Sequence, residues 1–116
     1  MSDIVDIPLA LEQAGGSADL AKDLFGMLLA DLPELQKQLN QAFEAGDRQA
    51  VWDHTHKIHG STAYCGVPAL REAAHAMEKA IKGGDGIDLA DPLAELNRAI
   101  DALLAEGPGF LEKDWT

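Results

Sequence analysis

Apolar residues recur every three or four positions along most of the chain, which is the spacing of amphipathic α-helices. The longest such run covers residues 17–46, with apolar positions at Leu20, Leu24, Met27, Leu28, Leu32, Leu35, Leu39 and Phe43. Ser17 is placed to cap this helix, and Gly46 is placed to end it. Because a proline inside a helix removes a hydrogen bond and clashes with the preceding turn, Pro33 predicts a kink near Asp31.

Turn-forming residues divide the chain on either side of this run. Residues 7–14 predict a short first helix that ends at the glycine pair Gly15-Gly16. Asp47 is the expected cap of a third helix, which carries the stretch HTHKIHGSTAYCG and stops around Gly66. Two further helices are therefore left to the C-terminal half of the chain.

The first of these is predicted over residues 67–82, before the pair Gly83-Gly84, and the second is predicted to start with Asp91 as cap and to end at Gly107. The tail GPGFLEKDWT has no predicted structure, and no strand pattern is present. The predicted fold class is all-α: an antiparallel up-and-down four-helix bundle with a short extra N-terminal helix. All 116 residues fit one domain.

Composition agrees with helices and restricts the partners. Hydrophobic residues make up 47% of the chain and aromatic residues only 5%. The formal net charge of −11 repels nucleic-acid backbones and anionic lipids, so neither nucleic acid nor direct membrane contact is expected. No apolar run approaches the ~20 residues of a membrane span, and the single cysteine, Cys65, cannot form a disulfide within the chain. We therefore expect a cytoplasmic protein.

Three of the four histidines lie between residues 54 and 59, and helical geometry separates them. With a rotation of about 100° per residue, the residues within about 60° of Ile58 form the buried strip: Val51, Thr55, Thr62 and Cys65. His54 lies at the edge of this strip. His56 lies about 160° away and is predicted to face solvent, with Trp52 and His59 on one flank and Lys57 on the other.

Gly60 follows His56 by one helical turn, although a mid-helix glycine costs about 1 kcal/mol relative to alanine. Its lack of a Cβ leaves room beside the imidazole for a phosphate or for a loop of another protein. The alternative is that Gly60 lets another helix pack closely. Trp52 is equally open to two interpretations, an exposed docking residue or a partly buried packing residue.

The possible chemistries differ in what they require. A zinc site needs three or four ligands, and no sequence spacing adds a third ligand to His56 and His59, so no metal is expected. Ser61 and Cys65 have no activating triad. An exposed imidazole is partly neutral near pH 7 and can attack an activated phosphoryl group. Because the chain has neither a P-loop nor a kinase motif, another domain must supply that group.

The segment His56-Lys57-Ile58-His59-Gly60-Ser61 resembles the motif of histidine-containing phosphotransfer (HPt) domains: histidine, basic residue, aliphatic residue, lysine or histidine, glycine and small residue. The resemblance covers about residues 7–105, which leaves 107–116 as a tail. It is closest to the C-terminal HPt segment of BarA/GacS-type hybrid sensor kinases. It implies a helical bundle with one exposed, phosphorylated histidine.

The resemblance also implies a role for each matching position. His56 is the phosphorylated histidine, Lys57 and His59 help to hold the phosphate or the attacking geometry, and Gly60 leaves clearance. His59 stands where many members have lysine. His54 and His75 match no catalytic position and are expected to be structural or surface residues.

The implied partners are receiver domains of a hybrid sensor kinase and of a response regulator. The chain itself would need no cofactor, since the Mg²⁺ is expected on the receiver, and it would be a monomeric phosphohistidine carrier without kinase activity of its own. Its location would be cytoplasmic, either free or as the C-terminal part of a membrane-bound sensor kinase. Two alternatives are a bundle that binds receivers without relaying phosphate and a metal-binding helical protein.

Overall fold

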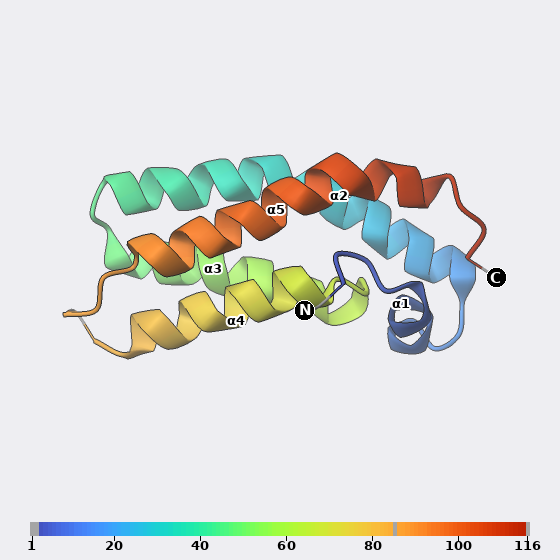
Figure 1. Cartoon of the computed structure of the whole chain (residues 1–116), viewed down its shortest axis with the longest axis horizontal. Coiled ribbons are helices and arrows are strands. Elements are labelled where there is room, and N and C mark those ends of the chain that lie inside the picture. Colours follow the sequence, from blue (N-terminus) through green and yellow to red (C-terminus); the bar gives the residue numbers. More distant parts are fainter. Residues whose placement is uncertain (1–2, 85, 116) are drawn as a thin grey trace.

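The computed structural model describes residues 3–84 and 86–115 and folds them into helices and connecting turns (Figure 1). The helices are α1 (Ile7–Gln13), α2 (Ala18–Glu44), α3 (Arg48–Ser61), the 3-10 turn η1 (Thr62–Tyr64), α4 (Pro68–Lys82) and α5 (Ala90–Leu111). No strand occurs among the described residues, so the predicted all-α class is confirmed. None of these helices is long and apolar enough to cross a membrane.

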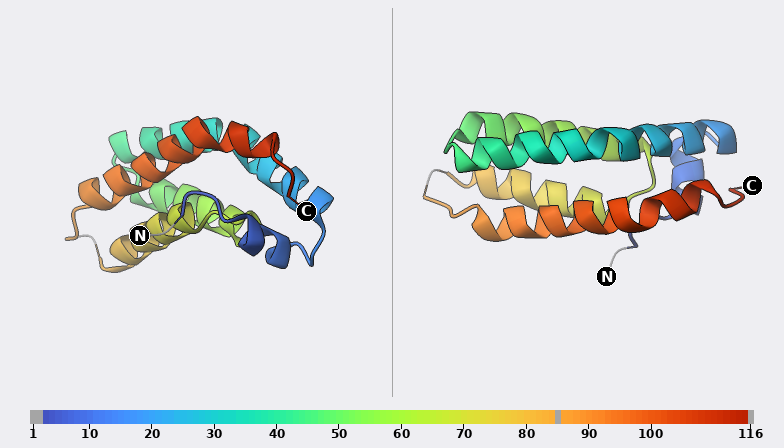
Figure 2. Two further views of the ribbon diagram at one scale, coloured as in Figure 1. Left: turned by 45° about the vertical axis from the view of Figure 1, so that its right-hand side comes forward. Right: turned by 90° about the horizontal axis from the view of Figure 1, so that it is seen from above.

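The four long helices form an up-and-down bundle. α2 and α4 each pack against both α3 and α5, so that every long helix has two long neighbours. Figures 1 and 2 show that these neighbours run antiparallel and that α1 lies across one end of the bundle, where it contacts α2 and η1. The molecule is 47 Å long and 22 Å across in both other directions. The predicted bundle with its extra N-terminal helix is confirmed.

Two predicted caps are present at the start of α2 and α3. The hydroxyl of Ser17 accepts a hydrogen bond from the Leu20 amide at 3.2 Å, and the carboxylate of Asp47 accepts one from the Ala50 amide at 3.0 Å. Pro33 lies inside α2, and Figure 1 shows the helix changing direction in its middle, as this proline predicts. The caps and the kink are thus local consequences of the sequence.

Gly66 connects the end of the histidine-bearing segment to the N-terminal part of the chain. Its φ of +62° is in the left-handed region, and a Cβ at this position would lie 2.5 Å from both the Ala10 Cβ and the Asp6 carbonyl oxygen. The Asp6 amide donates a hydrogen bond to the Gly66 carbonyl at 2.8 Å. Only glycine satisfies both the conformation and this close approach. The N-terminal segment therefore fixes the chain just after α3 and η1.

The last helix differs from the prediction at both ends. It begins at Ala90, whose amide donates to the Asp88 carboxylate at 2.9 Å, so Asp91 is not its cap. Nor does the helix end at Gly107. That glycine is buried, and a Cβ there would lie 2.6 Å from Cδ2 of Leu29, which means that it permits close packing of α5 on α2.

The tail without predicted structure packs onto the bundle. α5 continues to Leu111, and Trp115 then turns back so that its indole nitrogen donates to the Phe110 carbonyl at 2.7 Å. The Trp115 ring is only 3% exposed and lies 5.4 Å, centre to centre, from the ring of Phe25 in α2. Trp115 is therefore part of the hydrophobic core.

Candidate functional site

α3 directs His56 away from the core. Its side chain is 66% exposed, whereas Val51, Thr55 and Ile58 on the same helix are buried. Thr62 and Cys65 continue the buried strip beyond the helix, and His54 is half-buried beside it. The predicted rotation of α3 is therefore confirmed for all five strip residues and for His56.

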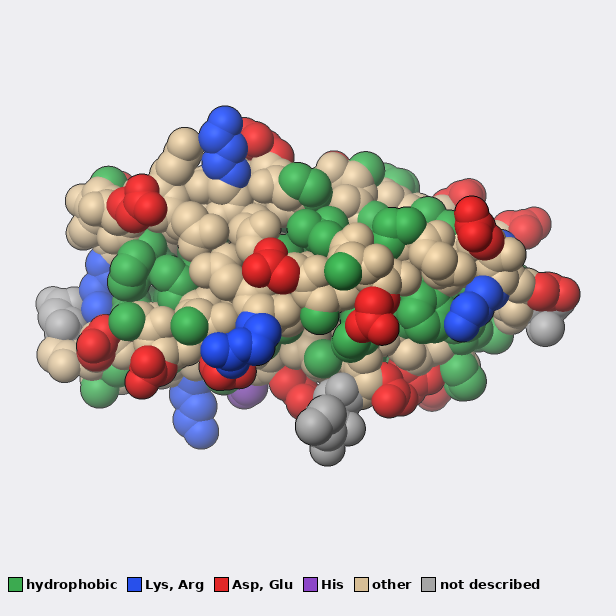
Figure 3. All heavy atoms as spheres, turned by 45° about the horizontal axis from the view of Figure 1, so that its top comes forward, with side chains coloured by type: hydrophobic (Ala, Val, Ile, Leu, Met, Phe, Trp, Pro, Cys, Tyr) green, Lys and Arg blue, Asp and Glu red, His purple; other side chains and the backbone are tan. Residues whose placement is uncertain are grey.

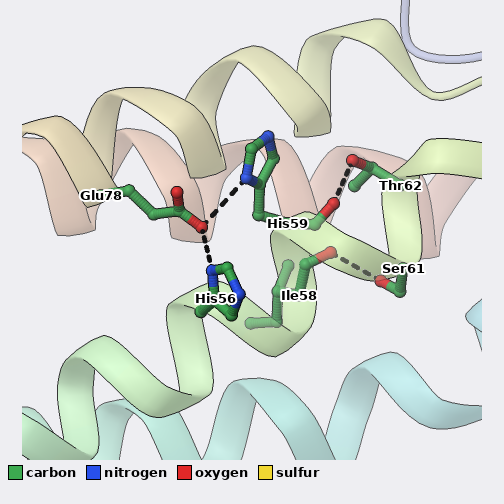
Figure 4. A network of polar contacts seen from close by, with 6 residues as sticks. All are labelled: His56, Ile58, His59, Ser61, Thr62 and Glu78. Carbon is green, nitrogen blue, oxygen red and sulfur yellow. Dashed lines mark hydrogen bonds and ion pairs between the residues drawn. The ribbon is translucent and has the colours of Figure 1, made fainter.

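Glu78 of α4 lies between two histidines of α3. Its Oε1 atom is 3.1 Å from Nδ1 of His56 and 2.9 Å from Nδ1 of His59 (Figure 4). The Glu78 side chain is only 8% exposed, and that of His59 is 23% exposed. A buried carboxylate is costly unless it is paired, so these two imidazoles stabilise Glu78 in its position.

This contact determines which nitrogen of His56 can react. An ionised carboxylate only accepts hydrogen bonds, so Nδ1 of a neutral His56 must carry the proton, and the lone pair is then on Nε2. Because the contact holds one edge of the ring against α4, Nε2 is at the opposite edge of the exposed imidazole. The arrangement presents one nucleophilic nitrogen to an approaching molecule.

Glu78 was not among the candidate residues chosen from the sequence. The available signal is its place in α4, where it directly follows Met77 and lies one turn after Ala74, both of which are buried. A carboxylate next to an apolar stripe must find a partner in the fold. Which partner it finds depends on the packing of α3 against α4.

Trp52 precedes His56 by one helical turn and stacks on it. The two ring centres are 5.4 Å apart with an angle of 15° between the planes. The ammonium of Lys82 in α4 lies 5.2 Å from the centre of the Trp52 ring. Trp52 is thus a half-buried packing residue that limits the movement of His56, and Lys82 adds a positive charge to the site that sequence analysis did not anticipate.

Open space surrounds Gly60 on the outer face of α3. A Cβ at this position would meet no atom within 4 Å, so no helix packs closely against Gly60. Close packing as the reason for this glycine is therefore wrong. Lys57 is exposed and lines a groove between α2 and α3 together with Met27 and Tyr64.

The two side chains that could have served as alternative nucleophiles are both engaged. The Ser61 hydroxyl donates to the Ile58 carbonyl at 2.6 Å, and the Cys65 thiol donates to the Ser61 carbonyl at 3.3 Å. Burial raises the pKa of the Cys65 thiol from 9.0 to about 11, which keeps it protonated and unreactive at neutral pH. Nucleophilic chemistry on these residues is therefore disfavoured.

His75 is exposed on α4, as expected for a surface residue, but it is not isolated. Its ring centre lies 5.7 Å from that of His59, so α4 adds both His75 and Glu78 to the pair of histidines on α3. The fold therefore brings two further possible metal ligands, His75 and Glu78, next to the histidines of α3. No spacing in the sequence indicated this arrangement.

The model of the Hpt domain family matches residues 23–106, which include α3, α4 and every residue of this site. The chain therefore belongs to the family of histidine-containing phosphotransfer domains.

Individual relatives agree with this assignment. The chain is 41% identical over 103 residues to the sensor histidine kinase GacS of Pseudomonas protegens, a match that covers 89% of this chain and 11% of GacS. It is 34% identical over 108 residues to the signal transduction histidine-protein kinase BarA of Escherichia coli K12, covering 92% of this chain and 12% of BarA. The chain thus spans 11–12% of the length of these relatives.

A solved structure has the same fold over nearly the whole chain. The crystal structure of the HPT domain from a sensor hybrid histidine kinase of Shewanella is similar with a TM-score of 0.75 and 27% sequence identity. The similarity covers 95% of this chain and 97% of the Shewanella domain.

Proposed function

We propose that Nε2 of His56 accepts a phosphoryl group from the aspartyl phosphate of one receiver domain and passes it to the aspartate of a second receiver. The observation that carries this proposal is the 3.1 Å contact between Nδ1 of the exposed His56 and the buried carboxylate of Glu78. It leaves Nε2 as the free, solvent-facing nucleophile. Membership of the Hpt domain family supports the same chemistry.

In the transfer, the Nε2 lone pair forms a bond to phosphorus while the bond between phosphorus and the aspartate oxygen breaks. The aspartate leaves as a carboxylate, and the imidazole ring acquires positive charge. Glu78 accepts the hydrogen bond from Nδ1 and stabilises that charge, which is also how a carboxylate assists the histidine of a catalytic triad. Donation to the second receiver is the reverse of this step.

The surface along α3 suits a receiver domain. His56, Gly60 and Tyr64 are spaced by four residues and so follow one side of the helical segment. Tyr64 is 59% exposed and Met27, across the groove, is 62% exposed, which gives a small apolar surface next to the reactive ring. Exposed apolar residues beside a polar site are typical of a docking surface. The open space at Gly60 would admit the phosphorylated loop of the partner.

The receivers would belong to a hybrid sensor kinase and to a response regulator, and the relay would operate in the cytoplasm. The Mg²⁺ of the receiver would balance the phosphate charge there. On this chain, the exposed Lys57 and the Lys82 that contacts Trp52 would be the basic residues that assist. His59 would act mainly by holding Glu78 in place.

Incubation with a radiolabelled, phosphorylated receiver of a GacS- or BarA-type kinase tests the proposal. We expect acid-labile, base-stable label on the wild-type chain and none on His56→Gln, with both proteins equally folded by circular dichroism. His54→Gln is the matched control and should be labelled normally. Label on His56→Gln would show that another residue is the acceptor.

A further inference from the structure

Beside the proposed phosphotransfer histidine, two helices bring three metal-binding side chains together. His59 comes from α3, and His75 and Glu78 lie three residues apart on α4. One donor atom from each of these residues lies within 4.8 Å of the other two. Because both elements are helices packed in the bundle, the positions of all three residues are set by the fold.

The donor set matches the preferences of a particular class of metal ion. Two imidazoles and one carboxylate are a known zinc ligand set in sites that keep a fourth position for water. Ligand atoms at zinc distances of 2.0–2.2 Å lie about 3.3 Å apart in a tetrahedral site. Rotation of side chains can close the remaining gap without movement of the backbone, and His75 is exposed and able to rotate.

An ion can reach these side chains from solvent. His59 and His75 line an open pocket at the junction of α3 and α4, whose other lining residues include Thr62, Arg71 and Glu72. The net charge of −11 favours cations over the molecule as a whole. The two histidines are therefore accessible from solvent, and the Glu78 carboxylate that contacts His59 is buried behind the surface.

We propose that His59, His75 and Glu78 bind one divalent transition-metal ion, for which Zn²⁺ is the probe, and that this ion withdraws Glu78 from His56. The same Oε1 atom of Glu78 contacts both His56 and His59. A metal bound to that oxygen replaces the hydrogen bond to His59 and weakens the one to His56. Neither part of the proposal depends on phosphotransfer.

Isothermal titration of ZnCl₂ into the full chain, free of any affinity tag and treated with a chelator, tests the binding. We expect one zinc ion per chain. His75→Gln should weaken binding by about ten-fold or more, since even residues behind the metal ligands are worth about 10–100-fold in affinity. His54→Gln, on the outside of the cluster, should bind like the wild type. Equal affinity of His75→Gln and the wild type, or no stoichiometric binding, would overturn the site.

Ring ¹⁵N NMR tests the effect on His56. One equivalent of Zn²⁺ should shift the Nδ1 signal of His56 in the wild type, and the same zinc concentration should leave it in place in His75→Gln. If zinc binds with the expected stoichiometry but the His56 signal does not move, the withdrawal of Glu78 is wrong. If the signal moves equally in His75→Gln, zinc binds at His56 itself and the proposed ligand set is wrong.

Discussion

Glu78 occupies a buried position of α4 and has two imidazole partners on α3. A hydrogen bond to a charged group contributes about 1.5–3 kcal/mol, against about 0.5–1.5 kcal/mol for a neutral pair. The contact also acts differently on the two states of His56, because the neutral ring gains positive charge as its Nε2 forms a bond to phosphorus. In the proposed transfer, Glu78 would therefore be a positioning residue whose charge favours the transfer step itself.

Glu78→Gln keeps the shape of the side chain and removes its charge. We expect the single-turnover rate at saturating receiver to fall about five- to ten-fold, from a loss of about 1 kcal/mol of charge stabilisation. The affinity for the receiver should not change, since Glu78 is buried. Glu106→Gln, at an exposed position of α5, is the control. A Glu78→Gln protein that transfers at the wild-type rate would contradict this role.

Gly60 is a residue whose effects on stability and activity should oppose each other. Gly60→Leu should stabilise the helix by about 0.5–1 kcal/mol, because leucine has the better helix propensity and a Cβ meets no atom within 4 Å. The same side chain would obstruct the partner beside His56 and slow transfer. Gly60→Ala separates the two effects, since it should give most of the stability and little obstruction. Urea unfolding measures the stability, and transfer rates measure the obstruction. Normal transfer by Gly60→Leu would show that the partner does not need the open space beside His56.

At the level of helices, local signals and long-range packing contributed differently to what the sequence could predict. The caps Ser17 and Asp47 and the rotation of α3 depend on neighbours within one or two turns, and they were predicted correctly. The ends of α5 were not, because the burial of Gly107 against Leu29 outweighs the usual tendency of glycine and proline to end a helix. Helix propensity depends on neighbouring residues, so it cannot predict a contact between Leu29 and Gly107, which are 78 positions apart in the sequence.

The candidate site also combines residues that one helix predicts with contacts that depend on packing between two helices. His56, Lys57 and Gly60 follow from the periodicity of one helix, and the resemblance to the Hpt family added their roles. The contacts of Glu78, Lys82 and His75 with α3 depend on how α4 packs against that helix. No spacing within the sequence encodes the register between α3 and α4, so the contact of His56 with Glu78 became visible only in the fold.

The C-terminal tail extends the core beyond the residues that the family model matches, which end at residue 106. Trp115→Ala should lower the free energy of unfolding by about 3 kcal/mol, because it removes a buried indole and its contact with Phe25. Urea unfolding followed by circular dichroism measures the change, with the exposed Glu112→Ala as control. An unchanged unfolding midpoint for Trp115→Ala would mean that the tail does not contribute to the core.

At the scale of the whole molecule, the acidic excess of this chain opposes docking to a receiver whose phosphorylation pocket is itself acidic. Figure 3 shows acidic side chains spread over the face formed by α2 and α5, with basic side chains among them. The Glu78 network lies instead between α3 and α4, and Lys57 lies at the groove between α2 and α3. Local positive charge beside His56, rather than net charge, should therefore guide association.

Reversal of one of these charges tests this distribution. Lys57→Glu should slow transfer several-fold at low salt, because it places a negative charge next to the incoming phosphate. The penalty should shrink as salt rises, since the Debye length is only about 10 Å at 0.1 M. Stability should hardly change, because Lys57 is exposed.

Lys37→Glu is the matched variant, because it changes the net charge equally from an exposed position on α2. Lys57 directly follows His56 in the sequence, whereas Lys37 is not among the residues that line the groove with Lys57, so reversal of Lys37 should slow transfer less. Rates for the three proteins, measured against one receiver across a salt series, separate the possibilities. Equal slowing by both variants would mean that the receiver responds only to total charge. Wild-type rates for Lys57→Glu at low salt would mean that Lys57 is an ordinary solvated residue of α3.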